Sequence, residues 1–219
     1  MNESTERIAV FTPEVFEVAD LDKAKGVILT GEPGTTTDER WAKETPFLAA
    51  DIAEQLALNA ESRVLDYGCG IGRIAKELIE KCGCRVIGVD ASRAMRELAP
   101  GYVLSDRFII WSPEVLEQML KRGLQFDCAI SLWVIQHVLD PEHVIRQIES
   151  SLPASGLFYA LNQRSRCVPT DQGWVSDGFD VLTALAAVFT ELDRYPLPDS
   201  VATPLLANQS SIQVLRRRS

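Results

Sequence analysis

A run of nine residues, VLDYGCGIG from Val64 to Gly72, combines a carboxylate with a glycine at every second position. Such glycines allow a sharp backbone turn that brings peptide N–H groups close to a ligand, and a helix starting there adds donors. A second carboxylate, Asp90, ends an apolar run downstream, where it is placed to accept hydrogen bonds from both hydroxyls of a ribose. Asp66 and Asp90 therefore predict a nucleotide-derived ligand. The alternative is a structural turn with a helix-capping Asp90.

The residue after the turn distinguishes between nucleotide types. The dinucleotide fingerprint G-x-G-x-x-G requires its third glycine at position 73, where this chain has Arg73. Asp66 also precedes the first glycine, and a carboxylate there repels a pyrophosphate but suits an amino group and a positive sulfonium. The pattern disfavours NAD and FAD and favours S-adenosylmethionine as the cofactor.

Alternating elements are expected to position these residues. Strands are predicted at 64–67, 85–90, 108–111, 126–132 and 157–161, with helices between them. The first helix is predicted to start at Thr45-Pro46, and the helix capped by Ser92 is predicted to stop before Pro100. Such alternation indicates βαβ units and a parallel sheet with both faces covered.

The pattern changes after residue 162. A polar loop of about 15 residues is predicted to lead to a helix near 179–188, and then to strands at 190–195 and 211–215. Loops of this length in compact domains are often functional, so the loop is a candidate part of the site.

With this order of elements, the glycine turn resembles that of the class I S-adenosylmethionine-dependent methyltransferases, in particular the small-molecule enzymes with one catalytic domain. The resemblance covers about 45–161 well and 162–219 only in the order of elements. It implies an α/β, Rossmann-like, doubly wound sheet of seven strands, mostly parallel with an antiparallel last strand. It divides the chain into an N-terminal extension or lid (1–44) and a methyltransferase domain (45–219), with an acceptor-side loop at 162–180.

The resemblance also assigns cofactor roles by position. The glycine turn would surround the methionine part of the cofactor, Asp90 would hold the ribose, and Arg40 would meet the cofactor carboxylate. Ser112 stands where the family often has an acid that meets the adenine amino group, a departure that weakens this contact. The expected cofactor-binding residues are Arg40, Asp66, Gly68, Cys69, Gly70, Gly72, Asp90, Ala91, Ser112, Pro113 and Leu132.

The acceptor side is expected after the fourth strand, because ligands of open α/β sheets bind outside the carboxyl ends of the strands. The stretch SLWVIQHVLD (131–140) looks like the aromatic-containing wall of small-molecule methyltransferases, and the Asn-Pro-Pro-Tyr motif of adenine and glutamine N-methyltransferases is absent. His137 is the candidate catalytic base, since its ordinary pKa lies near neutrality; the alternative is a packing histidine.

Further candidates for the acceptor lie in the segment after the fifth strand. Arg164 and Arg166 are suited to clamp an acceptor carboxylate or phosphate, or they are solvated loop charges. Trp174 is an aromatic lid or a packing anchor. The expected substrate-binding residues are Trp133, Gln136, Asn162, Arg164, Arg166 and Trp174.

Composition sets broader limits. The chain has 219 residues, a net charge of −9 and no apolar run approaching the roughly 18 residues of a membrane span, so neither a membrane nor a nucleic-acid partner is expected. The polar segment Met1–Arg7 predicts no signal peptide, and a cytoplasmic location is the simplest expectation. Five cysteines without a CxxC pair and only two histidines predict no metal site.

The leading hypothesis is transfer of a methyl group from S-adenosylmethionine to an O or N atom of a small molecule, with S-adenosylhomocysteine as the other product. The alternatives are a non-catalytic S-adenosylmethionine-binding or interaction module of the same fold, and a nicotinamide-dependent oxidoreductase, which Arg73 disfavours. A peptide acceptor also stays open. The sequence does not set the acceptor or the oligomeric state.

Overall fold

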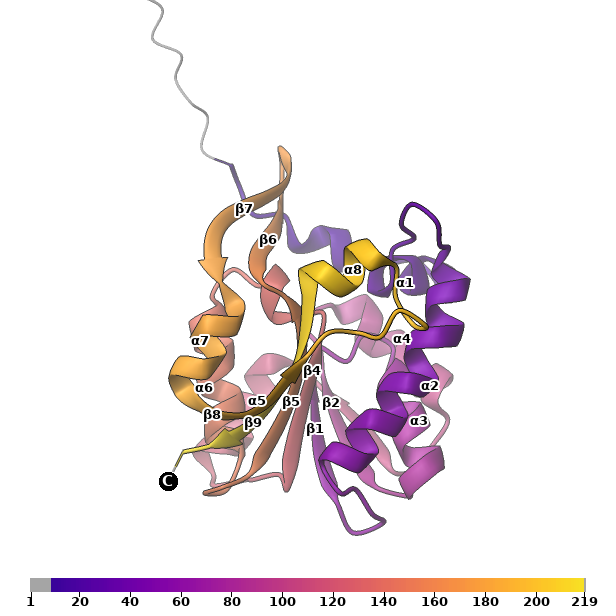
Figure 1. The fold of residues 1–219 in the computed structure, drawn as a ribbon. Helices are drawn as coiled ribbons and strands as arrows, with labels where there is room; N and C mark the ends of the chain where they lie inside the picture. Colours follow the sequence, from indigo (N-terminus) through magenta and orange to yellow (C-terminus); the bar gives the residue numbers. More distant parts are fainter. Residues whose placement is uncertain (1–8, 219) are drawn as a thin grey trace, which may run out of the picture.

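A twisted sheet forms the centre of the molecule in the computed structural model, which describes residues 9–218 (Figure 1). Within these residues, seven strands form this sheet in the order β3-β2-β1-β4-β5-β9-β8. Strands β1 to β5 are parallel, and β9 runs antiparallel to both of its neighbours, which confirms the expected fold class. The strands are β1 (Arg63–Tyr67), β2 (Arg85–Val89), β3 (Phe108–Trp111), β4 (Cys128–Leu132), β5 (Leu157–Gln163), β8 (Phe189–Tyr195) and β9 (Ser210–Arg217).

Helices cover both faces of the sheet, as the alternation predicted (Figure 1). One face packs against α2 (Thr37–Gln55) and α3 (Arg73–Cys82), and its core also receives side chains from α4 (Arg93–Val103) and α8 (Pro204–Gln209). The other face packs against α5 (Pro113–Lys121), α6 (Pro141–Ser151) and α7 (Val181–Val188). Burial of these apolar helix faces on the sheet is the main stabilising term of such a fold.

The helix α2 begins earlier than predicted. The Thr36 hydroxyl accepts from the Glu39 N–H at 3.2 Å, and the Glu39 carboxylate accepts from the Thr36 N–H at 2.8 Å. This capping box starts the helix at Thr37, so the predicted start at Thr45-Pro46 is wrong, and Pro46 lies inside the helix with its ring exposed. The helix runs across the expected boundary between residues 44 and 45, and the division into extension and domain stays a prediction.

The prediction that α4 stops before Pro100 is also wrong. The helix continues to Val103, and the Pro100 carbonyl accepts from the N–H of Leu104, the left-handed residue that ends it. Proline usually ends helices because its preceding residue avoids the helical region. Here the buried Ala99 and Val103 pack on the core one turn apart, and this contact outweighs the local preference.

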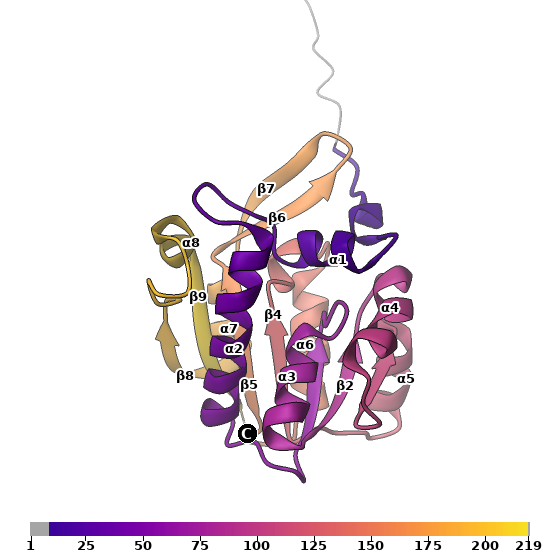
Figure 2. The same cartoon turned by 90° about the vertical axis from the view of Figure 1, so that its right-hand side faces the viewer.

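The predicted polar loop is a β-hairpin. Strands β6 (Ser165–Thr170) and β7 (Gly173–Asp180) pair antiparallel and project from the carboxyl edge of the sheet (Figure 2). Most side chains of β7 are exposed, so the strand lacks the apolar alternation by which a sequence reveals a strand. The loop prediction failed for that reason.

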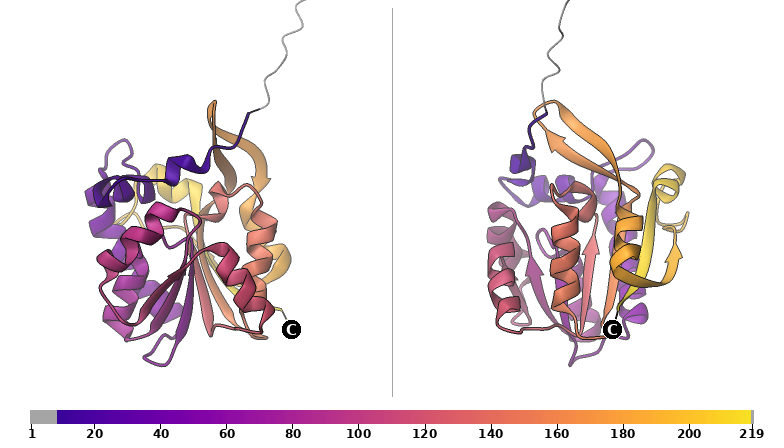
Figure 3. Two further views of the ribbon diagram at one scale, coloured as in Figure 1. Left: turned by 180° about the vertical axis from the view of Figure 1, so that it is seen from behind. Right: turned by 90° about the vertical axis from the view of Figure 1, so that its left-hand side faces the viewer.

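The N-terminal segment lies over the same end of the sheet as the hairpin (Figure 2; Figure 3). It contains a short 3₁₀ helix η1 (Pro13–Phe16) and the helix α1 (Leu21–Ile28). Phe11 pairs with Thr170 in an isolated β-bridge, and the Thr12 N–H donates to the Pro169 carbonyl at 3.0 Å. Two segments far apart in the sequence therefore form one cover. The polar Met1–Arg7 lies outside the described residues.

Candidate active site

The glycine turn between β1 and α3 needs glycine for two reasons. Gly68, Gly70 and Gly72 have φ angles of 77°, 56° and 81°, in the left-handed region that other residues rarely adopt. A Cβ on Gly68 would also lie 2.2 Å from a Val134 methyl, and one on Gly70 would lie 2.7 Å from Ile28 Cδ1. The turn is thus bordered by the segment after β4 and by α1, the elements that would enclose a ligand.

Asp66 is a buried carboxylate at the end of β1. It is 3% exposed, and it accepts no hydrogen bond from any residue within 9–218. Burial raises the pKa of Asp66 to about 7, although the positive charge of Arg73 opposes this shift. A buried acceptor without a donor is costly, so this site suits a ligand that brings N–H donors, such as an ammonium group.

Asp90 follows β2 and lies beside the same turn. One carboxylate oxygen accepts from the Gly70 N–H at 2.7 Å and the other from the Ser92 N–H at 2.9 Å. These bonds fix the carboxylate, and each oxygen keeps a further lone pair for a ligand hydroxyl. Burial raises the pKa of Asp90 to about 6, against the effect of these two bonds. The geometry fits a pair of ribose hydroxyls.

The other predicted cofactor residues differ in burial and in their position relative to these two carboxylates. Cys69 is buried, and burial raises the pKa of its thiol well above the usual value, so the thiol stays protonated. Ala91 is exposed beside Asp90. Ser112 and Pro113 begin α5 at the end of β3, and the Ser112 hydroxyl lowers the pKa of Glu114.

The exit of β4 is held in an unusual conformation. Leu132 ends the strand, and Trp133 follows it with a φ of 63°, which is sterically unfavourable for a non-glycine residue. The Trp133 N–H donates to the Leu161 carbonyl at 2.7 Å, so β5 fixes this backbone. The indole N–H donates to the Glu44 carboxylate on α2 at 3.3 Å. The predicted acceptor wall is therefore tied to a helix that precedes the glycine turn in sequence.

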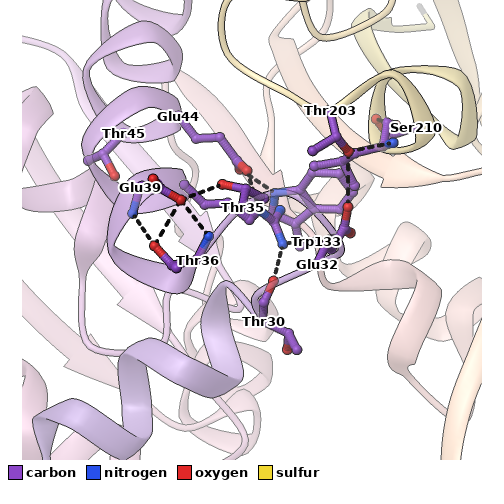
Figure 4. A network of polar contacts seen from close by, with 12 residues as sticks. Thr30, Glu32, Thr35, Thr36, Glu39, Glu44, Thr45, Trp133, Thr203 and Ser210 are labelled. Carbon is purple, nitrogen blue, oxygen red and sulfur yellow. Dashed lines mark hydrogen bonds and ion pairs between the residues drawn. The ribbon is translucent and has the colours of Figure 1, made fainter.

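Glu44 and Arg40 form a buried ion pair within a wider polar network (Figure 4). Arg40 Nε donates to Glu44 Oε1 at 2.6 Å, and Arg40 Nη1 donates to the Thr30 carbonyl at 2.7 Å. The Arg40 guanidinium also lies 5.8 Å from the centre of the Trp133 ring. Arg40 thus lies near the predicted site, but Glu44 and Thr30 accept from two of its nitrogens. Glu44 was not predicted from the sequence, because nothing local marks a glutamate in an exposed-looking helix as buried.

Arg73 is a second buried cation beside this network. It is 3% exposed, donates to the Thr45 hydroxyl at 3.1 Å and stacks at 5.5 Å over the Trp41 ring. Burial lowers the pKa of Arg73 to about 10, which keeps the guanidinium charged at neutral pH. The sequence showed Arg73 only as a departure from the dinucleotide fingerprint. In the structure the positive charge of Arg73 interacts with the carboxylates of Asp66 and Glu44, which the sequence did not indicate.

His137 lies in the short helix η2 (Ile135–His137) and is tied to its neighbours through both ring nitrogens. Nδ1 lies 2.7 Å from the Cys167 carbonyl, which can only accept, so Nδ1 carries the proton. Nε2 is therefore the basic nitrogen, and the Gln136 amide lies 2.9 Å away as its donor. Burial lowers the pKa of His137, so the ring is neutral at physiological pH.

Gln136 and Asn162 join this histidine to the end of β5. The side-chain Oε1 of Gln136 accepts from the Gln163 N–H, and the side-chain Oδ1 of Asn162 accepts from the Gln136 N–H at 3.4 Å. Asn162 Nδ2 is buried and has no hydrogen-bond partner within residues 9–218. A buried donor without an acceptor is uncommon, and the role of Asn162 in binding an acceptor molecule stays a prediction.

Trp174 reaches His137 from the hairpin. The ring centres are 5.0 Å apart, and Phe16 of the N-terminal segment lies 6.4 Å from each of them. Phe16 was not predicted, because a single aromatic residue in an irregular segment carries no pattern. The Glu17 carboxylate then accepts from the backbone N–H groups of Arg93 and Ala94 at the start of α4. The N-terminal segment thus connects the hairpin to the Asp90 side.

The two arginines of the hairpin have protein partners. Arg164 donates to Asp180 at 2.9 Å and is largely exposed. Arg166 pairs with Asp177 and also donates to the carbonyls of Val138 and Leu139. These contacts hold the hairpin in place, and a role in binding an acceptor anion stays a prediction for both.

A cavity of about 350 Å³ lies between the root of the hairpin and α8. Most of its lining side chains are uncharged and able to form hydrogen bonds. They are Gln163, Arg164, Ser165, Cys167, Ser176, Asn208 and Gln209. Arg164 was predicted as a site residue, whereas Asn208 and Gln209 of α8 were not, because they are distant from it in sequence.

The described residues contain no group of three or more metal-ligating side chains. In the same part of the chain, none of the helices has the length and apolar character needed to cross a bilayer.

Comparison with known proteins agrees with this geometry. A family model described as methyltransferase domain matches residues 36–200. The uncharacterized methyltransferase C70.08c of Schizosaccharomyces pombe is 27% identical over 161 residues, covering 71% of this chain and 60% of that protein. The ubiquinone biosynthesis O-methyltransferase of Chelativorans sp. (strain BNC1) is 32% identical over 98 residues, covering 44% of this chain and 38% of that protein. The chain therefore spans less than two thirds of the length of either relative.

A solved structure shares the fold. The N-methyltransferase NodS from Bradyrhizobium japonicum WM9, in complex with S-adenosylhomocysteine, aligns with a TM-score of 0.60 and 17% identity, over 82% of this chain and 88% of that chain. This similarity concerns the fold alone. Because the family model covers well over half of the chain, and the sheet order agrees with it, the chain belongs to the class I S-adenosylmethionine-dependent methyltransferases.

Proposed function

We propose that the protein transfers a methyl group from S-adenosylmethionine to an O or N atom of a small polar molecule. The observation that carries this proposal is Asp66, a buried carboxylate without a hydrogen-bond donor, beside three left-handed glycines and the oriented carboxylate of Asp90. These groups fit the ammonium and ribose of the cofactor, whereas they would repel a pyrophosphate. When bound, the cofactor supplies an electrophilic methyl group on a sulfonium.

The residues of this chain would bind the cofactor, orient it and exclude water. Asp66 would accept from the amino group of the cofactor, and Asp90 would accept from the ribose hydroxyls. Val134 borders the glycine turn, and together with the preceding Trp133 it would exclude water from the reacting atoms. Transfer by in-line displacement needs mainly such positioning, since a well-oriented bound pair avoids much of the entropic cost.

His137 is proposed as the group that takes the acceptor proton. Its Nδ1–H bond to the Cys167 carbonyl leaves Nε2 as the basic atom, and the lowered pKa keeps that nitrogen unprotonated at neutral pH. An acceptor hydroxyl or amine that replaces the Gln136 amide at Nε2 would hand its proton to this nitrogen.

The chemical class of the acceptor is inferred from the residues that line the cavity beside the hairpin. The cavity between the hairpin and α8 is lined mainly by uncharged polar side chains, which favours a small polar molecule. The unpartnered Asn162 amide provides a further donor near this end of β5. The name of one relative, a ubiquinone biosynthesis O-methyltransferase, favours oxygen, and His137 suits a hydroxyl or an amine, so both acceptor atoms are retained. A cytoplasmic location stays a prediction from composition.

Calorimetric titration with S-adenosylhomocysteine tests the cofactor part of this proposal. The unchanged protein should bind, and Asp66→Ala and Asp90→Ala should each weaken binding at least tenfold. Asp38→Ala, an exposed residue in the first turn of α2, is the matched control and should leave the affinity unchanged. Absence of binding by the folded protein would refute the proposal.

A screen of small acceptors with radiolabelled S-adenosylmethionine tests the catalytic part. We expect methylation of polar hydroxyl- or amine-bearing compounds, and His137→Ala should lower kcat about 10²-fold or more if the imidazole takes the proton. Cofactor binding without turnover of any acceptor class would instead favour a non-catalytic binding module of the same fold.

A further inference from the structure

Three arginines stand side by side at the edge of the sheet opposite to the glycine turn. Arg63 and Arg85 are the first residues of β1 and β2, and they are direct neighbours in the strand register. Arg107 immediately precedes β3, and its carbonyl accepts from the Val86 N–H at 2.9 Å, so it lies beside Arg85. Neighbouring strands are about 4.8 Å apart, which places three guanidinium-bearing residues in one short row.

Two of these side chains are held in place by the protein. The Arg63 guanidinium pairs with Asp127 at 3.1 Å, and Arg107 Nη1 donates to the Gly83 carbonyl at 2.8 Å. The Arg85 guanidinium has no hydrogen-bond or ion-pair partner among residues 9–218. A guanidinium has five N–H donors, so Arg63 and Arg107 also keep donors for a further partner.

The charges of this row are not balanced locally. The cavity lining holds three guanidinium groups and one carboxylate, that of Asp106, while Asp127 outside the lining pairs with Arg63. Like charges held side by side on neighbouring strands repel each other. In a chain of net charge −9, a row of adjacent arginines is not a consequence of overall composition. An anion bound between them would relieve this repulsion.

The same residues line a concave site with an apolar side. A cavity of about 130 Å³ is lined by the three arginines together with Asp106, Val86, Ile87 and Ile109. Ile109 is 52% exposed although it lies in the middle of β3. Guanidinium donors next to exposed aliphatic surface suit a ligand that has an anionic head and an apolar body.

We propose that this row, Arg63, Arg85 and Arg107, is a binding site for a small organic anion. A phosphate or carboxylate group would accept from the guanidinium N–H groups, and an apolar part of the ligand would lie on Ile109. The site lies at the amino ends of the strands, whereas Asp66 and Asp90 lie at the carboxyl ends. Its ligand is therefore distinct from the methyl donor and the acceptor.

Amide chemical-shift titration of the full chain with phenyl phosphate tests this proposal. Saturable shifts should appear at residues 85–87 and 107–109, and saturating S-adenosylhomocysteine should not reverse them. Parallel titrations with benzoate and inorganic phosphate distinguish a carboxylate from a phosphate head. Arg85→Gln should weaken binding at least tenfold, whereas Arg122→Gln, an exposed arginine outside the cavity lining, should change it less than twofold.

Ile109→Ser gives an independent control for the apolar part. It should weaken phenyl phosphate about tenfold and leave inorganic phosphate unchanged. The proposal is overturned by shifts that never saturate, by equal weakening in Arg85→Gln and Arg122→Gln, or by shifts located at the glycine turn. Unchanged affinity of each variant for S-adenosylhomocysteine shows that the fold is intact.

Discussion

Replacement of Glu44 by alanine tests whether the buried polar network stabilises the fold. Glu44 is fully buried, and its carboxylate accepts from Arg40 Nε at 2.6 Å and from the Trp133 indole at 3.3 Å. Glu44→Ala leaves a buried guanidinium without its counter-charge and an indole N–H without an acceptor. We expect a clear loss of stability, because both groups lost their contacts with water on folding.

The magnitude follows from these two contacts. Removal of one partner of a buried ion pair costs about 3–5 kcal/mol, and an unsatisfied buried donor costs about 1–3 kcal/mol. Arg40 keeps its bond to the Thr30 carbonyl and lies 3.9 Å from Glu32, so its isolation is incomplete. We therefore expect a loss of about 3 kcal/mol in the free energy of unfolding.

Urea unfolding followed by tryptophan fluorescence and circular dichroism measures this loss. Glu54→Ala is the matched control, because Glu54 is exposed on the same helix and should change stability by less than about 0.5 kcal/mol. The double variant Arg40→Met with Glu44→Leu should recover much of the loss, since apolar residues of similar size replace the buried charges.

Two results would refute this reasoning. If Glu44→Ala lowers the free energy of unfolding by no more than Glu54→Ala, the carboxylate is not buried against Arg40 in solution. If the double variant loses as much as the sum of its two single changes, the cost does not come from an isolated charge.

Three further outcomes are expected. The affinity for S-adenosylhomocysteine, measured by calorimetry, should fall about 20-fold from pH 8 to pH 6. The pKa values of Asp66 and Asp90 are raised to about 7 and about 6, so both carboxylates gain protons in this range and only their ionised forms accept both ligand groups. Asp66→Asn should remove most of this pH dependence. Asp51→Ala should cost about 2 kcal/mol in thermal unfolding, because the hydroxyls of Tyr159 and Tyr195 donate to this carboxylate at 2.6 and 2.7 Å. Gly68→Ala should weaken S-adenosylhomocysteine at least tenfold, since its Cβ would meet Val134, whereas Gly101→Ala, with open space around it, should bind normally. Equal affinities for the two glycine variants would contradict the close packing of the turn.

The parts of the fold that the sequence revealed are those with local signals. The strand at 108–111 was predicted with the bounds that the structure has, because a short apolar run lies between turn residues. The glycine turn was likewise visible, since left-handed backbone at Gly68, Gly70 and Gly72 requires the residue type that stands there. Asp66 and Asp90 could be predicted as neighbours because parallel strands end at one edge.

The parts that the sequence concealed depend on distant contacts or on exposure. Glu44 meets Trp133 across 89 positions, and no periodicity within α2 indicates that pairing. The hairpin was hidden because β7 is exposed along most of its length, so its polar residues gave no strand pattern. The start of α2 was misplaced because the capping box at Thr36 and Glu39 was overlooked in favour of a proline.

The junction between the N-terminal segment and the hairpin has a consequence for the order of folding. Across 161 positions, the Val10 N–H donates to the Asp171 carboxylate, and the Asp171 N–H donates to the Val10 carbonyl. During synthesis these bonds cannot form until residue 171 has left the ribosome, whereas β1, β2 and β4 have been made well before. Contacts of such large separation close late because the loop entropy must be overcome first. The cover formed by the N-terminal segment and the hairpin can therefore close only after the strands that carry Asp66 and the glycines have been synthesised.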